Sequence, residues 1–288
     1  MSKKRLYVIG NGFDCMYGLP TKVSDFERHL SEKRIYNEID NANEILNNYG
    51  VYWGEFEEGL SHIDTEEIFS RNMQSPDYLS DHESDRDGGI LNMQMYTDSL
   101  EESVREALDD MIQEAENELD EKECITKPLF NEGDQIVSFN YTSTIERLYD
   151  LPEGTNIIHI HGDSDGNKIF GYKEQLDQPL VMSSSEEDYY VDEQKEVVNS
   201  MYKRLQKDYK YQELNDFLVK NCQDIDEVVV IGHSMADVDS EYMETIESVV
   251  RPTKWSISQY NQEPSIKSLS EYSFADRINP FDSRDVLK

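Results

Sequence analysis

Residues 7–14 read Tyr7-Val8-Ile9-Gly10-Asn11-Gly12-Phe13-Asp14, and Gly18-Leu19-Pro20 follows shortly afterwards. The apolar start is typical of a buried strand, and the two glycines allow a sharp turn into a helix. The positive end of a helix dipole and its backbone N–H groups favour an anion such as phosphate. The stretch therefore predicts a strand, a turn and a helix. The turn either contacts the phosphate of a nucleotide or serves the architecture alone.

Three later segments have the same form, in which an apolar strand ends in polar residues. They are Ile136-Val137-Ser138-Phe139-Asn140-Tyr141-Thr142, Ile157-Ile158-His159-Ile160-His161-Gly162, and Val228-Val229-Val230-Ile231-Gly232-His233-Ser234 with Asp237 and Asp239 beyond it. Strands that alternate with helical patterns predict an α/β fold with a mostly parallel, doubly wound sheet. Ligands of such sheets bind beyond the carboxyl ends of the strands, so we expect all four segments to contribute to one site.

These segments resemble the hallmark blocks of AbiH, a family of bacterial abortive-infection proteins. The matching blocks are GNGFD with GLPT, FNYT, HG, and GHS followed by Asp, and residues 53–57 are similar to the tryptophan block of that family. The resemblance spans nearly the whole chain. It implies an antiphage effector that responds to a phage-derived or other protein trigger.

The order and spacing of the same blocks also resemble the NAD-binding domain of sirtuins. The matching positions are Gly10, Gly12, Gly18, Pro20, Asn140, His161, Gly232 and Ser234. This resemblance covers only the strand ends. It implies a Rossmann-like, sirtuin-like sheet with NAD as the substrate.

Two departures from the sirtuin pattern limit what it implies. Asp14 stands where sirtuins carry serine; it suits a helix N-cap but brings a carboxylate near any pyrophosphate. The three cysteines are Cys15, Cys124 and Cys222, which are too few and too scattered for the four-cysteine zinc site of sirtuins. Protein deacylation is therefore not expected.

Two residues are the candidate catalytic groups. Cleavage of the bond between nicotinamide and ribose builds positive charge on the sugar, so the site must orient a water molecule. The amide of Asn140 has a donor and an acceptor for that purpose, and His161 is suited to activate or orient the water because histidine titrates near neutrality. The structural alternatives are an Asn140 that caps the next helix and a His161 that is simply a buried, hydrogen-bonded histidine.

The resemblances imply contacts between the nucleotide and a further set of residues, which consists of Gly10, Asn11, Gly12, Phe13, Asp14, Pro20, Thr21, Gly232, His233, Ser234 and Asp239. Helix capping and a part in acid–base chemistry are the alternative roles for Asp239. His159 and His161 alternate on one strand, but no third ligand is evident, so no metal is expected. A catalytic triad of Ser234, a histidine and Asp237 is a further possibility. We do not favour it, because the sequence around Ser234 lacks the G-x-S-x-G nucleophile elbow.

The composition bounds the class of protein. The 288 residues include 61 acidic and 27 basic side chains, a net charge of −34. This charge opposes binding to nucleic acid or to anionic membranes. No apolar run is long enough to span a membrane, and the apolar stretch after Met1-Ser2-Lys3-Lys4-Arg5 is too short for a secretory signal, so we expect a cytoplasmic protein.

We expect a single sirtuin-like α/β domain over residues 1–288 with a helical insertion over residues 24–130. Within it, residues 70–89 are polar and turn-rich and predict an exposed loop. Ser99-Leu100-Glu101-Glu102 resembles a capping box that begins an amphipathic, acidic helix. Residues 168–172 predict one more strand, and residues 187–222 predict a long helical region. The insertion is suited equally to being a lid, a cover for the sheet or a homo-oligomer contact.

The sequence thus predicts an AbiH-type antiphage effector that is an NAD+ glycohydrolase, hydrolysing NAD to nicotinamide and ADP-ribose. Two alternatives stay open. One is a non-catalytic nucleotide-binding sensor, or an acidic interaction module, in phage defence. The other is an enzyme that acts on a different nucleotide or on nucleic acid.

Overall fold

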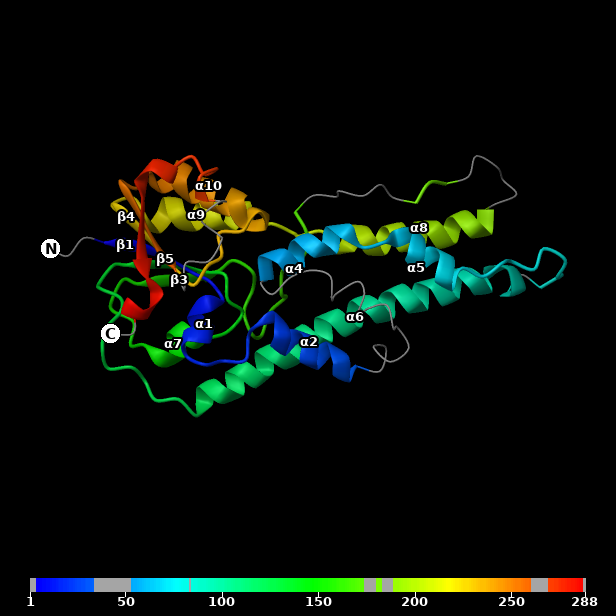
Figure 1. Cartoon of the computed structure of the whole chain (residues 1–288), viewed down its shortest axis with the longest axis horizontal. Helices are drawn as coiled ribbons and strands as arrows, with labels where there is room; N and C mark the ends of the chain where they lie inside the picture. Colours follow the sequence, from blue (N-terminus) through cyan, green and yellow to red (C-terminus); the bar gives the residue numbers. More distant parts are fainter. Residues whose placement is uncertain are drawn as a thin grey trace. The chain divides into compact units, whose positions relative to one another are not determined.

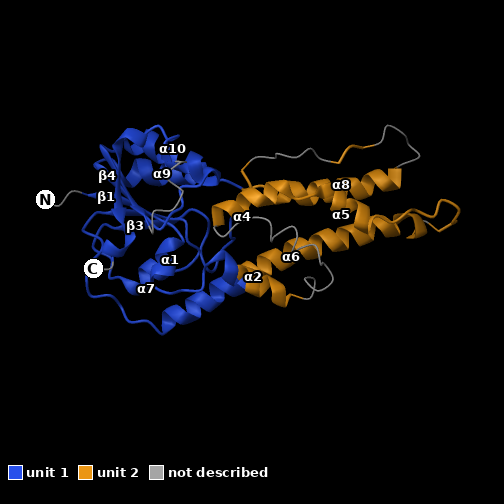
Figure 2. Cartoon of the chain, in the orientation of Figure 1, with its two compact units in different colours: residues 1–25, 109–169, 208–288 blue, residues 26–108, 170–207 orange. Residues whose placement is uncertain are grey.

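The computed structural model describes residues 4–33, 53–82, 84–173, 180–182, 189–259 and 269–286. The chain divides into two compact units (Figure 2). Unit 1 comprises residues 1–25, 109–169 and 208–288, and unit 2 comprises residues 26–108 and 170–207. The expected insertion over residues 24–130 overlaps unit 2 only in part, since residues 109–130 belong to unit 1 and residues 170–207 add to unit 2.

Unit 1 contains a six-stranded, all-parallel sheet in the order β3-β2-β1-β4-β5-β6. Its strands are β1 (Arg5–Ile9), β2 (Gln135–Ser138), β3 (Asn156–His159), β4 (Glu227–Ile231), β5 (Lys254–Gln259) and β6 (Ile278–Asp282). The parallel α/β class predicted from the sequence is confirmed. The strand order reverses between β1 and β4, and this switch point is where doubly wound sheets bind ligands.

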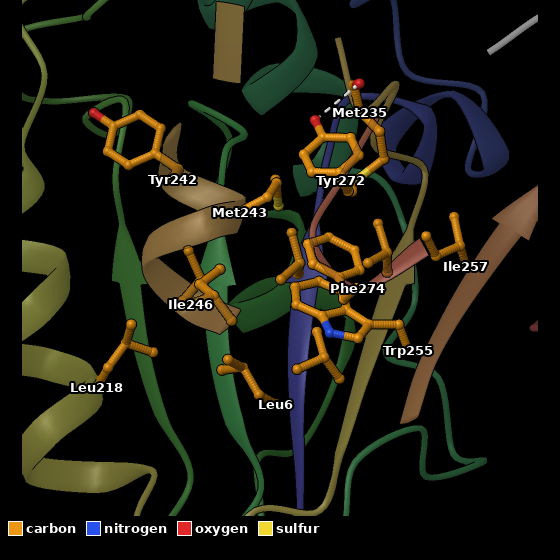
Figure 3. Packing of buried hydrophobic residues seen from close by; sticks show 14 of the residues in the cluster. Leu6, Leu218, Met235, Tyr242, Met243, Ile246, Trp255, Ile257, Tyr272 and Phe274 are labelled. Atoms are coloured by element: carbon orange, nitrogen blue, oxygen red, sulfur yellow. Dashed lines mark hydrogen bonds between the residues drawn. The ribbon is translucent and has the colours of Figure 1, made fainter. Parts of the chain in front are cut away.

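One face of the sheet carries the first hydrophobic core (Figure 3). Alternate residues of the central strands, among them Leu6 and Val230, point to this face, which α9 (Tyr211–Asn221) and α10 (Ser240–Val250) cover (Figure 1). The indole of Trp255 stacks on the ring of Phe274 with centroids 3.8 Å apart. Burial of each such ring contributes about 2–3 kcal/mol, which fixes the chain after β5 against the sheet.

The opposite face of the sheet carries the second core. The other alternate residues of β1 and β4, such as Tyr7 and Ile231, pack there against α1 (Gly12–Met16), α7 (Thr144–Leu148) and the C-terminal part of α6 (Ser84–Asp120). Apolar residues on both faces explain the unbroken apolar runs in the sequence. The two layers of helices hold the carboxyl ends of β1, β2 and β4 in place.

Unit 2 is helical. It contains most of α2 (Val23–Glu32), α4 (Trp53–Gly59), the 3-10 helix η2 (Leu60–His62), α5 (Thr65–Asn72), the first part of α6 and α8 (Tyr189–Arg204). The rings of Trp53 and Phe56 lie 5.6 and 5.2 Å from that of Phe26. The tryptophan block therefore belongs to the core of this unit.

An ion pair is also buried in unit 2. Lys207 Nζ lies 3.0 Å from Glu57 Oε1, and the side chain of Lys207 is 0% exposed. The N–H of Gly171 donates to the same carboxylate oxygen at 3.3 Å. The pair thus joins α4 to two other parts of the chain within this unit.

Several local predictions were wrong. Helix α6 begins at Ser84, so part of the predicted loop is helical and Ser99 does not start the helix. Residues 168–172 do not form a strand, and only an isolated β-bridge joins Tyr172 to Gln206. The backbone cannot continue as a strand there because Gly171 has φ 146° and its N–H donates to Glu57. β6 was not predicted.

Among the helices in the described part of the chain, none is long and apolar enough to cross a membrane.

Candidate functional site

The turns after β1 and β4 are in close contact, and glycine is required on both sides. A Cβ atom on Gly10 would lie 2.6 Å from His233 Cα, and one on Gly12 would lie 2.8 Å from Gly232 Cα. Gly232 has φ +67°, and a Cβ there would lie 2.2 Å from the backbone nitrogen of Phe13. The glycine turn therefore lies at the switch point of the sheet.

Three amides of the glycine turn are already hydrogen-bonded within unit 1. The N–H of Gly10 donates to Ile231 O at 3.0 Å, that of Gly12 to Gly232 O at 2.7 Å, and that of Phe13 to Gly10 O at 2.8 Å. These three groups are not available as donors to a phosphate in this conformation. Contact of the turn with a ligand stays a prediction, and the architectural role of its glycines is explained by the packing.

Asp14 is buried in α1 at the edge of this turn, with 1% of its surface exposed. Its Oδ1 accepts a hydrogen bond from Asn140 Nδ2 at 2.9 Å, and its Oδ2 accepts one from Thr142 Oγ1 at 2.7 Å. Asp14 is not the N-cap of α1. That position belongs to Asn11, whose side chain makes no capping bond. The carboxylate instead links the ends of β1 and β2.

Burial raises the pKa of Asp14 to about 6, even though the hydrogen bonds from Thr142, Thr144 and Asn140 lower it. At neutral pH the carboxylate is therefore mostly ionised while being shielded from solvent. A buried carboxylate with a pKa near the operating pH is a common feature of functional sites.

The amide of Asn140 has a defined orientation. An ionised carboxylate can only accept hydrogen bonds, so the end of the amide that faces Asp14 must be its NH2 group. The other end, Oδ1, is buried and has no hydrogen-bond partner among the described residues. Buried polar atoms nearly always have a partner, so this oxygen is a vacant acceptor of the kind that holds a water molecule or a ligand.

His161 follows β3 at the same end of the sheet at which Asn140 follows the neighbouring strand β2. β2 and β3 pair Ser138 with His159, and the N–H of Ile160 donates to Ser138 O at 2.9 Å. Both strands end there, and His161 lies in the turn that follows β3. The ring of Phe139 packs against that of His161, whereas the amide of Asn140 is bonded to Asp14, so a shared site for Asn140 and His161 stays a prediction.

Asp239 lies between two histidines. Its Oδ1 is 3.3 Å from His161 Nε2 and its Oδ2 is 3.4 Å from His233 Nε2, and all three side chains are less than a tenth exposed. His161 Nε2 and Asp239 Oδ1 lie within ion-pair distance, but their geometry does not meet the angles of a hydrogen bond. A buried carboxylate beside two imidazoles favours the tautomer with Nε2–H on each ring.

The ring orientations of both histidines are fixed. The N–H of Met235 donates to His233 Nδ1 at 3.0 Å, so the proton of neutral His233 is on Nε2, facing Asp239. The ring of Phe139 is edge-on to His161 and His233, with centroids 4.9 and 4.4 Å away. Phe139 directly precedes Asn140, so the histidine cluster and the Asp14–Asn140 pair are built on the same strand end.

His159 belongs to a separate contact. Both of its ring nitrogens face acceptors, with Nδ1 2.9 Å from Asn140 O and Nε2 2.9 Å from Glu146 Oε1. Burial alone lowers its pKa, but the hydrogen bonds and the charge of Glu146 outweigh burial and raise the pKa. His159 therefore stabilises the backbone of Asn140. No group of three or more potential metal ligands is present in the described part of the chain.

The comparison with protein families identifies the chain. The family model described as "Bacteriophage abortive infection AbiH" matches residues 6–259. The chain belongs to this family. No curated protein and no solved structure matches it.

The remaining predicted residues of this AbiH protein lie around the same strand ends. Asn11 Nδ2 is 3.7 Å and Thr21 Oγ1 is 3.9 Å from Cys15 Sγ. Pro20 precedes the buried Thr21, and Ser234 is exposed, with its Oγ accepting from the N–H of Ala236 at 3.4 Å. Their contact with a nucleotide stays a prediction.

Sequence reasoning missed two relationships in this AbiH site. It did not find that Thr142 donates a hydrogen bond to the Asp14 carboxylate, although Thr142 lies in the FNYT block that resembles a hallmark block of the family. It also treated Asp239 mainly as a nucleotide contact or a cap. Asp239 occupies the N-cap position of α10 but makes no capping bond, and its carboxylate faces the histidines instead. Side-chain contacts between residues more than 70 positions apart produce no local pattern in the sequence.

Proposed function

We propose that this AbiH protein binds NAD, or a related nucleotide, at the switch point between β1 and β4 and hydrolyses it to nicotinamide and ADP-ribose. One observation carries this proposal. Asn140 Oδ1 is buried and has no partner among the described residues, while its Nδ2 is held by Asp14. That arrangement suits the capture of a reacting water molecule.

The reaction needs the following from these residues. A water oxygen forms a bond to C1′ of the ribose as the bond from C1′ to the nicotinamide nitrogen breaks. The bonding electrons pass to the pyridinium, which leaves as neutral nicotinamide, and the water releases one proton. Asn140 Oδ1 accepts a hydrogen bond from this water and so directs its lone pair at the sugar.

His161 is the proposed acceptor of the proton. Asp239 lies 3.3 Å from Nε2, so the carboxylate stabilises the imidazolium that forms when the other ring nitrogen, Nδ1, takes up the proton. His233 on the far side of Asp239 holds the carboxylate in place. In this proposal Asp239 and His233 are positioning residues, and Asn140 and His161 are the catalytic ones.

The glycine turn limits how a nucleotide can bind. The space beside Gly10, Gly12 and Gly232 is filled by the chain itself, and three amides of the turn are engaged. The pyrophosphate must therefore find other donors, and the exposed hydroxyl of Ser234 at the end of β4 is a proposed one.

Activation by a protein trigger is proposed to involve unit 2. Eight of the nine exposed large hydrophobic residues described lie there, and the ninth, Val219, is in unit 1; the eight are Met73, Tyr78, Leu79, Leu91, Met95, Val181, Met182 and Tyr189. Exposed apolar residues that form a contiguous patch are typical of contact surfaces, so we propose that some of these eight contribute to one. An enzyme that consumes NAD needs restraint before infection, and such a surface provides a place for control.

The experiment is incubation of the purified full chain with NAD, followed by chromatography of the nucleotides. The proposal expects nicotinamide and ADP-ribose from the parent, with a loss of at least about 100-fold for Asn140→Ala and His161→Ala. Lys220→Glu, an exposed change on α9, is the control and should retain activity. NAD that is bound but recovered intact would favour the sensor, and a parent without products from NAD or other nucleotides, even when taken from infected cells, would contradict the proposal.

A further inference from the structure

Unit 1 contains a cavity of about 500 Å³ that none of the candidate site residues lines. The cavity lies over the sheet face that carries α1 and α7. Tyr7 of β1 and Val229 and Ile231 of β4, which belong to that face, form its floor. Leu129 and Phe281 form part of its walls. A cavity of this size is in the range of small-molecule sites.

We propose that this cavity is a second ligand site, which takes a small aromatic molecule carrying a single anionic group. The proposal is independent of NAD hydrolysis, because it uses other residues on a different part of the sheet. Two observations select this class of ligand. One is the charge of the lining, and the other is the state of its tyrosine hydroxyls.

The lining of the cavity is close to neutral, unlike the rest of the chain. The whole sequence has 61 acidic and 27 basic residues, whereas the cavity is lined by two cations, Arg5 and Lys127, and one acid, Asp285. Arg5 Nε is committed to Glu227 at 3.0 Å. The remaining charges of the lining are those of Lys127 and Asp285, and the exposed Lys127 is the cation left to contact an anion at the rim. In a protein of net charge −34, a nearly neutral cavity with one such cation at its rim repels a small anion less than the rest of the surface does.

The aromatic lining selects the body of the ligand. The hydroxyls of Tyr17 and Tyr149 are hydrogen-bonded to each other, and the hydroxyl of Tyr7 donates to Leu129 O at 3.3 Å. Since these polar ends are engaged by the protein, the rings present apolar faces and edges to the cavity. Such rings favour a flat aromatic partner over a polar one such as a sugar.

The test uses two dyes that share one aromatic skeleton. 8-Anilinonaphthalene-1-sulfonate carries an anion, and N-phenyl-1-naphthylamine lacks it. Titration of the full chain, followed by dye fluorescence, should show saturable binding of the sulfonate to one site. The sulfonate should bind about three- to tenfold more tightly than the neutral dye, which is the range expected for one partly screened charge contact.

Variants locate the binding. Val229→Phe fills the floor and should abolish binding, while Lys127→Glu should weaken the sulfonate about three- to tenfold and leave the neutral dye unchanged. Two controls should bind like the parent. Lys220→Glu makes the same charge change outside the cavity, and Leu91→Ser removes an exposed apolar side chain of unit 2 to which the dyes could also bind.

Three results would overturn the proposal. One is the absence of sulfonate binding below about 1 mM. Another is equal affinity for the two dyes. The third is sulfonate affinity that Lys127→Glu leaves at the parent value. If Val229→Phe fails to fold, as judged by circular dichroism, Lys127→Glu still decides the outcome because Lys127 is exposed.

Discussion

Asn140 Nδ2 donates a hydrogen bond to the buried carboxylate of Asp14 across 2.9 Å, although 126 positions separate the two residues. The bond joins the end of β2 to the helix after β1 and fixes which atom of the amide points away. Burial holds the pKa of Asp14 at about 6, so the protein keeps a shielded charge at neutral pH. Such a charge destabilises the fold, and its retention is expected where function requires it.

Replacement of Asp14 by Asn should change how stability depends on pH. The folded pKa is raised above the unfolded value of 3.8, so the folded parent binds the proton more strongly and loses stability as the pH rises from about 4 to about 6. Asp14→Asn lacks this loss. Between pH 4.5 and 7.5 the variant should therefore gain about 2 kcal/mol relative to the parent.

Calorimetric unfolding at the two pH values measures this gain for Asp14→Asn. Asp216→Asn, which changes an exposed acid on α9, is the control and should show no comparable pH dependence. A constant stability difference between Asp14→Asn and the parent across this range would show that Asp14 does not titrate near pH 6.

The close contact of the two turns predicts different costs for two glycines with similar backbone angles. Gly18 has φ +73°, and no other atom lies within 4 Å of the point where its Cβ would be, whereas a Cβ on Gly232 would meet Phe13 N at 2.2 Å. Gly18→Ala should cost about 1 kcal/mol from backbone strain alone. Gly232→Ala should cost at least about 3 kcal/mol, because the turns must separate. Urea unfolding compares the two, and equal costs would show that the turns are not tightly packed.

The contact between His159 and Glu146 predicts a second loss of stability with rising pH, in a higher pH range. The pKa of His159 is raised in the folded protein, so its stabilisation is complete below the unfolded value of 6.5 and is lost as the pH rises through the folded pKa. Glu146→Gln keeps an acceptor but removes the charge. Glu146 is more than a third exposed, so the loss should be only a few tenths to about 1 kcal/mol at pH 5.5.

At pH 9 the stability of Glu146→Gln should approach that of the parent. Thermal unfolding at both pH values tests this convergence, with Glu153→Gln as an exposed control. A difference that is as large at pH 9 as at pH 5.5 would exclude a charged His159 as its origin.

The buried pair in unit 2 predicts a large effect from a small change. Glu57→Gln removes the carboxylate that lies 3.0 Å from Lys207 Nζ, and the loss of one partner of a buried pair costs about 3–5 kcal/mol. Glu57→Gln with Lys207→Met should recover much of that loss. The two tryptophans lie in different units, so fluorescence of Trp53 in a Trp255→Phe background follows the urea unfolding of unit 2. A double variant no more stable than Glu57→Gln would contradict the buried-charge explanation.

The parallel sheet could be predicted because apolar runs such as Val228-Val229-Val230-Ile231 and the glycines that follow them are local signals. β6 was missed because Ile278–Asp282 includes Pro280 and polar residues, which suit the edge position that it occupies. The start of α6 was misplaced because two adjacent glycines, Gly88 and Gly89, usually indicate a turn. The Cβ position of Gly89 lies against the side chain of Gln194 of α8, so packing in unit 2 favours glycine there.

The members of the candidate site could be chosen from the sequence, but not their pairings. Asn140 and His161 were chosen by their positions after β2 and β3, which are neighbouring strands, and their meeting in one site stays a prediction. The partners of Asp14 and Asp239 depend on contacts between distant segments. Local pattern indicated helix capping for both aspartates, and tertiary packing directed both carboxylates elsewhere.

The central claim is that Asn140 and His161 act on NAD during infection, and mass spectrometry of the NAD pool in infected cells tests it most directly. Cells expressing the parent should lose NAD and gain nicotinamide and ADP-ribose after infection. Asn140→Ala should keep the pool intact and lose protection, and Lys220→Glu should behave like the parent. Protection by the parent with an unchanged NAD pool, or equal NAD loss in Asn140→Ala, would contradict the account.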